Sequence, residues 1–137
     1  MIEDQEKIKE LLALTKNIKC NRCQNHGKAS HFHQNPAYQI KGDLLLACWS
    51  DEKCLERTGG SFTLFIPSRD NPELIQKVFP NSYAILCSNC REIGKPSKFN
   101  PDPEIAAEKA TQLFCPNCNS GKNFSMLVGV RLPERKI

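Results

Sequence analysis

Two stretches of the chain carry the same frame of residues, 67 positions apart. The frame is a C-x-x-C pair followed at fixed spacing by glycine, lysine, serine and phenylalanine, with six identities in thirteen positions. The copies read Cys20-Asn-Arg-Cys23-Gln-Asn-His-Gly27-Lys28-Ala-Ser30-His-Phe32 and Cys87-Ser-Asn-Cys90-Arg-Glu-Ile-Gly94-Lys95-Pro-Ser97-Lys-Phe99. An internal repeat of this kind predicts one supersecondary unit that is used twice.

The cysteines beyond this frame complete two sets of four. Cys115 and Cys118 form another C-x-x-C pair, whereas five residues separate Cys48 from Cys54. Two thiolates that bracket two residues can hold one face of a zinc ion, and a second pair completes the tetrahedron. The spacing therefore predicts two structural Zn²⁺ ions. Their expected ligands are Cys20, Cys23, Cys48 and Cys54 in the first site, and Cys87, Cys90, Cys115 and Cys118 in the second.

Disulfide and redox interpretations of the cysteines are less favourable. Residues 1–6 lack the basic and apolar segments of a secretory signal, so we expect a cytoplasmic or other reducing intracellular compartment. A redox C-x-x-C pair requires a βαβ setting, but these pairs lie between apolar, strand-like runs. His26, His31 and His33 are alternative ligands for the first site, although four cysteines already suffice there.

With two ligand pairs per ion, each half of the chain resembles the zinc-ribbon group, in which two knuckles on β-hairpins clamp one metal ion. The resemblance covers residues 18–130 and rests on the ligand pairs. It implies a small metal-stabilised α+β fold with two tandem four-cysteine zinc-ribbon modules, each built of short β-hairpins. It implies function only loosely, because zinc ribbons serve transcription, translation, replication and scaffolding alike.

Helical and strand patterns around the cysteines suggest five segments. Ile8, Leu11 and Leu12 lie at helical spacing near the N-terminus, and Asn71-Pro72 is typical of a helix start. The expected segments are an N-terminal amphipathic helix (1–17), module 1 (18–67), a helical linker (68–81), module 2 (82–130) and a basic C-terminal tail (131–137). The expected strands are 44–48, 61–66, 82–86 and 123–130, and one more short helix is expected over 105–113.

The lysine and phenylalanine of the repeated frame have two possible roles. The first is structural: Gly27 and Gly94 would adopt positive φ, and the two phenylalanines would pack over the hairpin, which we favour. In the second, strand alternation places Lys28, Ser30 and Phe32 on one face, suited to a phosphate and a base. For the lysines, the sequence leaves solvated surface and phosphate contact equally open.

Other candidate binding residues lie near the second knuckle of module 1 and at the C-terminus. Trp49 follows a ligand directly, and is interpreted either as a lid over the sulfur atoms or as an anchor for a partner. The net charge is +4, and the excess of basic residues lies in 120–137. The candidate nucleic-acid or partner-binding residues are Lys28, Lys95, Lys98, Trp49, Arg131, Arg135 and Lys136.

The sequence does not support a zinc enzyme or a membrane-spanning protein. Four cysteine ligands leave no open metal position for water, and the H-x-E motif of zinc deaminases is missing. The longest apolar run, residues 44–49, is far shorter than the roughly 20 residues that span a bilayer.

We therefore expect a non-catalytic double zinc-ribbon protein that binds RNA or DNA, or is an accessory subunit of a nucleic-acid-processing complex. The alternative is a protein–protein adaptor that docks through the N-terminal helix and Trp49, without nucleic-acid contact.

Overall fold

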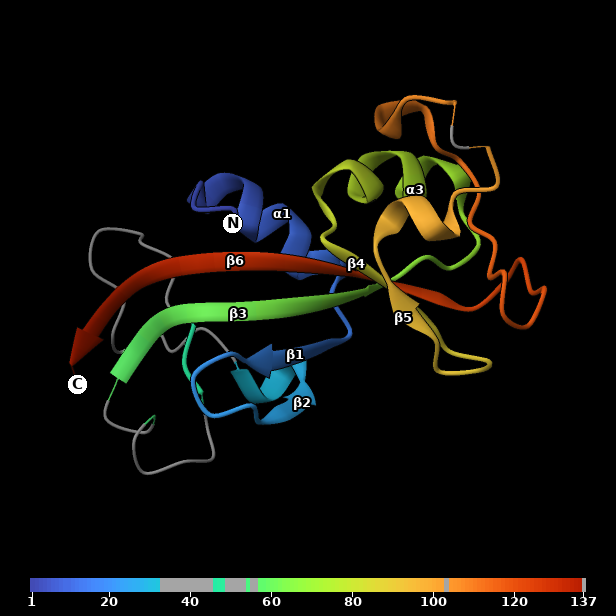
Figure 1. Ribbon diagram of the computed structural model, residues 1–137. Helices are drawn as coiled ribbons and strands as arrows, with labels where there is room; N and C mark the ends of the chain where they lie inside the picture. Colours follow the sequence, from blue (N-terminus) through green and yellow to red (C-terminus); the bar gives the residue numbers. More distant parts are fainter. Residues whose placement is uncertain (33–45, 49–53, 55–56, 103, 137) are drawn as a thin grey trace. The chain divides into compact units, whose positions relative to one another are not determined.

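The computed structural model describes residues 1–32, 46–48, 54, 57–102 and 104–136 (Figure 1). The chain folds into two compact units. Unit 1 comprises Met1–Phe65 and Gly129–Ile137, and unit 2 comprises Ile66–Val128. The chain passes between the units inside two long strands, β3 (Arg57–Pro67) and β6 (Phe124–Lys136).

Unit 1 begins with helix α1 (Gln5–Leu14), which confirms the helix expected within 1–17. The Asp4 side chain caps it by accepting hydrogen bonds from the first free backbone N–H groups. Ile8 and Leu11 are buried, so the apolar stripe belongs to the core of unit 1. The strand order is β2-β1-β3-β6, and β1 (Asn17–Cys20) is antiparallel to both β2 (His26–Lys28) and β3.

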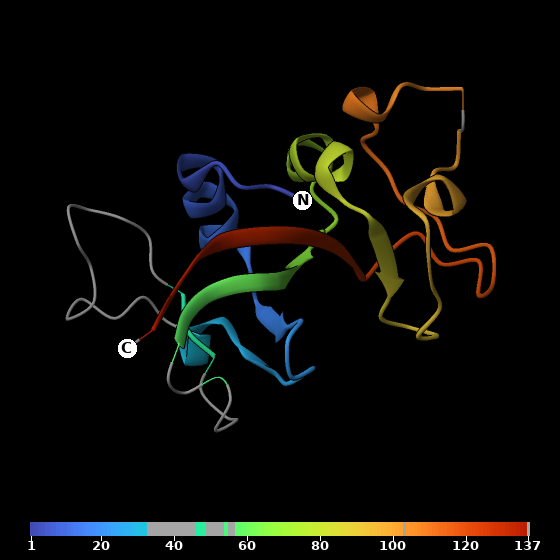
Figure 2. The same ribbon diagram turned by 60° about the vertical axis from the view of Figure 1, so that its left-hand side comes forward.

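Unit 2 repeats this arrangement with fewer strand residues. Helix α3 (Pro72–Val78) is capped by Asn71 and followed by the 3₁₀ turn η3 (Phe79–Asn81). Strand β4 (Ala84–Cys87) is antiparallel to β5 (Ile93–Gly94) and to the beginning of β6. The two views in Figures 1 and 2 show α3 (green) beside the orange segment that leads to the last two cysteines.

The structural repeat begins earlier than the sequence repeat. α3 lies 67 residues after α1 and buries Ile75 and Val78, the counterparts of Ile8 and Leu11. After each helix a hydroxyl donates to the carbonyl four residues earlier, from Thr15 in one copy and Ser82 in the other. The residues expected as a helical linker, 68–81, therefore contain the first helix of the second copy, because its apolar face is needed in the core of unit 2.

The two phenylalanines of the repeated frame are core residues, as favoured. Phe32 and Phe99 have no exposed surface. Each lies 6.1 Å, centroid to centroid, from a phenylalanine on the long strand, Phe62 in unit 1 and Phe124 in unit 2, in edge-to-face geometry. Such pairs contribute about 1 kcal/mol beyond the area they bury.

Two details of the expected local structure are wrong. Residues 29–32 form the 3₁₀ turn η1 (Ala29–Phe32), and η4 (Pro96–Phe99) is its counterpart, so side chains do not alternate there as in a strand. The tighter turn carries each phenylalanine back over its hairpin. The helix expected over 105–113 is only the short turn η5 (Ala107–Lys109), because the chain runs extended afterwards to bury Leu113 and reach Cys115.

Two further expectations concern 44–48 and the C-terminal tail. Residues 44–45 lie outside the described part of the chain, and 46–48 are not in a strand. The expected tail, 131–137, is instead strand up to Lys136, since β6 continues along unit 1 with Leu132 buried. Ile2 supports this strand through a parallel bridge to Val130.

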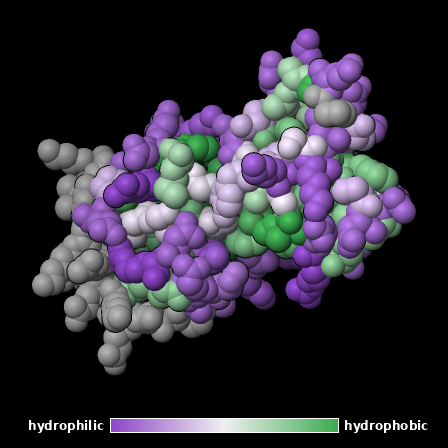
Figure 3. Space-filling model, viewed as in Figure 1, coloured by the Kyte–Doolittle hydropathy of each residue, from purple (hydrophilic) through white to green (hydrophobic). Residues whose placement is uncertain are grey.

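Hydrophilic side chains prevail on the face shown in Figure 3, with apolar ones in smaller areas.

Gly59 and its counterpart Gly121 should respond differently to the same substitution. Gly59 has φ +77, and an added Cβ would overlap the carbonyl oxygen of Pro133. The nearest atom to a Cβ on Gly121 is the Leu113 oxygen, 3.9 Å away. We expect Gly59→Ala to lower the free energy of unfolding by at least about 2 kcal/mol, and Gly121→Ala by less than about 1 kcal/mol. Thermal unfolding followed by circular dichroism measures both, and equal losses would contradict the packing described here.

Candidate metal centres

Three of the four cysteine pairs sit in knuckles of the same backbone geometry. In each, the N–H of the first cysteine donates to the carbonyl five residues later, at 2.8–2.9 Å. The residue four positions after the first cysteine donates back to that cysteine's carbonyl at 2.8 Å. This residue has positive φ in every case: 63° at Gln24, 66° at Arg91 and 60° at Asn119.

The positive φ was expected elsewhere, at Gly27 and Gly94, and that expectation is wrong. Neither glycine has positive φ; both lie in the short strands that follow the turn. The reversal of the chain happens three residues earlier, where the knuckle closes. Gln24 and Arg91 therefore adopt a conformation that costs a non-glycine residue about 1 kcal/mol or more, and the hydrogen bonds of the knuckle hold them there.

In unit 1 the sulfur atoms of four cysteines gather in one cluster. The Sγ atoms of Cys20 and Cys54 are 3.9 Å apart, and those of Cys23 and Cys48 are 3.5 Å apart. All four lie within 4.8 Å of one another. Three of these residues are buried and Cys23 is half-buried, so the cluster is largely closed off by the protein.

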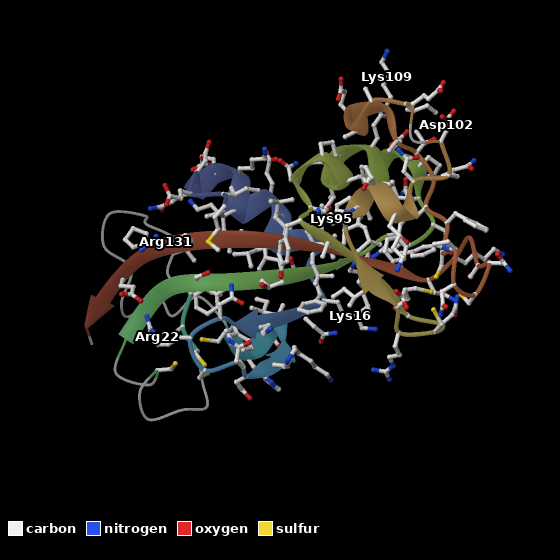
Figure 4. The ribbon with its side chains drawn as sticks, in the orientation of Figure 1. Lys16, Arg22, Lys95, Asp102, Lys109 and Arg131 are labelled. Carbon is white, nitrogen blue, oxygen red and sulfur yellow. The ribbon has the colours of Figure 1, made fainter. Side chains whose placement is uncertain are left out.

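In unit 2 the other four cysteines form an equivalent cluster. The Sγ atoms of Cys87 and Cys118 are 3.6 Å apart, as are those of Cys90 and Cys115. Again all four lie within 4.8 Å of one another. A disulfide would require about 2.05 Å, and none of the eight cysteines forms one. The two groups of sulfur atoms, yellow in Figure 4, could therefore each hold one metal ion.

Each cluster contains one thiol whose pKa is strongly raised. Desolvation, followed by contacts with neighbouring thiols, raises the pKa of Cys54. Desolvation and contacts with the other three thiols raise the pKa of Cys118 to about 12, although the Ser120 N–H opposes this. By contrast, hydrogen bonds from the Asn117 side chain and the Glu92 N–H lower the pKa of Cys90 to about 6. Four thiols this close cannot all ionise without a cation among them.

The two clusters differ in the residue at the middle of the first knuckle. In unit 1 this residue is Arg22, whose guanidinium pairs with Glu134 on β6. Burial lowers the pKa of Arg22, but the contact with Glu134 and the nearby Cys54 sulfur outweigh it and raise the pKa. The sequence signal for this role is a cation placed between two cysteines of one pair.

In unit 2 the equivalent residue is Asn89, which is neutral. Its side-chain amide donates to the Ser120 hydroxyl at 2.7 Å and to the Lys122 carbonyl at 3.0 Å, and accepts from the Asn123 amide. These bonds tie the first knuckle of unit 2 to the loop after the second. Unit 1 therefore has a nearby positive charge at its cluster, whereas unit 2 has a network of neutral hydrogen bonds.

The other candidate binding residues fall into three groups. Lys28, at the end of β2, and Lys95, just before η4 and labelled in Figure 4, are exposed and occupy equivalent positions in the two units. Lys98 pairs with Glu92 and lies 5.9 Å from the centre of the Phe99 ring. The remaining candidates lie on β6 (Arg131, exposed, with Arg135 and Lys136) or, like Trp49 and His33, outside the described residues.

Searches of protein-family models, curated proteins and solved structures returned no match to this chain. Among the described residues, no helix has the length and apolar character required to cross a bilayer.

Replacing one ligand should empty one cluster and leave the other intact. Cys87→Ser removes a buried thiolate from unit 2, and a serine hydroxyl does not ionise to replace it. We expect bound metal, measured by plasma mass spectrometry, to fall from about two ions to about one per chain. Amide signals of unit 2 should lose dispersion while those of unit 1 persist. The neighbouring Ser88→Ala should keep both ions; a variant Cys87→Ser that also keeps both would refute the assignment.

Proposed function

We propose that both clusters bind Zn²⁺ as structural ions in zinc-ribbon modules. Zinc bonds thiolate sulfur at about 2.3 Å, which in a tetrahedron separates the sulfur atoms by about 3.8 Å. The four measured Sγ–Sγ distances, 3.5 to 3.9 Å, agree with this value. Four thiolates fill the tetrahedron and leave no position for water or substrate, which supports a non-catalytic role.

We further propose that the protein binds nucleic acid, alone or as an accessory subunit of a nucleic-acid-processing complex. The observation that carries this is the equivalent placement of Lys28 and Lys95, both exposed after the first knuckle of their unit. The phenylalanines of the same frame are buried and cannot stack on a base. Contact through these lysines would therefore be made with phosphates, which position a protein on nucleic acid without reading its sequence.

The adaptor alternative has weaker support in its original form. It relied on the apolar face of the N-terminal helix, but Ile8 and Leu11 of that face are in the core of unit 1. Trp49, its second element, lies outside the described residues. A protein-binding role would therefore require another surface.

The nucleic-acid proposal predicts a specific change in salt dependence. Binding of a fluorescent single-stranded or duplex oligonucleotide should weaken steeply with salt, as counterions are released from each contacted phosphate. The double variant with Lys28→Gln and Lys95→Gln should bind more weakly and reduce the slope of log K against log salt by about two.

A matched control is Lys109→Gln, because Lys109 is likewise an exposed lysine, at the end of the 3₁₀ turn η5, but lies outside the repeated frame (Figure 4). It should leave the slope unchanged. The proposal fails if the wild-type chain binds no oligonucleotide, or if the double variant and the control behave alike.

A further inference from the structure

Unit 2 has an open groove beside the start of β6. Its volume is about 330 Å³, at the lower end of the range for ligand sites. Its lining is mainly apolar and includes Pro72 and Ile75 of α3, Leu113, Phe114 and Phe124, together with Lys122. Ile75, Leu113 and Phe124 are buried residues that form its floor, whereas Phe114 is exposed at its side.

The equivalent place in unit 1 is covered by the chain itself. In the strand register, Phe62 lies opposite Cys20 and Phe124 lies opposite Cys87, so the two phenylalanines are equivalent. Counting back from them, Gly59-Gly60 of unit 1 corresponds to Gly121-Lys122 of unit 2. In unit 1 the backbone of Pro133 and Glu134 lies directly against Gly59, and the Glu134 carboxylate reaches Gly60 and Arg22. Leu132, one residue earlier, is only 2% exposed.

Among the described residues, no such segment covers the groove of unit 2, because the chain turns away after β3. After β3 the chain reverses at Arg69 and Asp70, both with positive φ, and starts α3. The Asp70 carboxylate accepts the N–H of Asn123 and so fixes this turn beside the groove. A Cβ on Gly59 would overlap the Pro133 backbone, whereas a Cβ on Gly121 would meet only the Leu113 oxygen, 3.9 Å away.

We propose that this groove of unit 2 binds an extended peptide from a partner protein, with an aliphatic residue, a proline and an acidic residue in succession. The covered counterpart in unit 1 supplies the pattern, which is Leu132-Pro133-Glu134. The apolar floor suits the aliphatic residue. Lys122, an exposed cation at the position of Gly60, offers a partner for the acidic residue, as Arg22 does in unit 1.

Peptide binding in the groove differs from phosphate contact at Lys28 and Lys95 and does not depend on it. An added peptide strand gains affinity from main-chain contacts and specificity from side-chain pockets. The groove thus gives the protein a surface for a protein partner that does not involve the N-terminal helix.

The test uses the full-length, zinc-loaded protein labelled with ¹⁵N and a synthetic peptide with the sequence of residues 131–137. Saturable shifts of amide signals are expected at 111–114 and 121–124. A peptide with serine in place of Leu132, which keeps the charge, should bind at least tenfold more weakly. No saturable shift at millimolar peptide, or shifts located elsewhere, would overturn the proposal.

Two variants separate the groove from the rest of the protein. Gly121→Leu puts a side chain into open space and should weaken peptide binding at least tenfold, whereas Gly121→Ala should change it less than twofold. Lys122→Glu should weaken it about fivefold or more without filling the groove. Unchanged binding by both Gly121→Leu and Lys122→Glu would refute the proposal. Gly121→Leu should bind the oligonucleotide as tightly as the wild-type protein does. A failure of the peptide-binding proposal can therefore be told apart from a failure of the nucleic-acid proposal.

Discussion

Four cysteine sulfur atoms within 4.8 Å of one another are the constraint around which each unit is built. Desolvation, together with contacts between neighbouring thiols, raises the pKa of Cys54 and of Cys118, whereas four thiolates that surround a cation bind it tightly. Each of the three described knuckles holds two of these sulfur atoms. The pairing of β1 with β3, and of β4 with β6, fixes the first knuckle of each unit next to the long strand.

The same unit is completed in two different ways. In unit 1, β6 runs on beside β3, and Glu134 on it pairs with Arg22 at the first knuckle. In unit 2 the chain instead turns into α3, and Asn89 secures the knuckles with neutral hydrogen bonds. The two copies thus share the frame of four clustered cysteines and differ at their outer edges, where unit 1 is covered and unit 2 has an open groove.

The grouping of the cysteines into two sets of four and the burial of the phenylalanines were predictable, because fixed cysteine spacing and a repeated apolar position carry direct geometric meaning. The shared helix was not recognised, since α1 and α3 have in common little more than Glu6 with Glu73 and Ile8 with Ile75. The strand at the C-terminus was hidden by its charged residues, because Leu132 acquires its burial only from packing in unit 1. Residues 105–113 have helical composition, but the need to deliver Cys115 to its cluster overrides that preference.

The central claim is that each unit folds around its own ion, and a cobalt titration of the metal-free protein tests it most directly. Co²⁺ in a tetrahedral thiolate site gives intense visible and charge-transfer absorption, and circular dichroism reports folding in the same sample. The account predicts that both signals rise together and stop at about two equivalents of Co²⁺ per chain. A metal-free protein that is already fully folded, or a breakpoint at one equivalent, would contradict it.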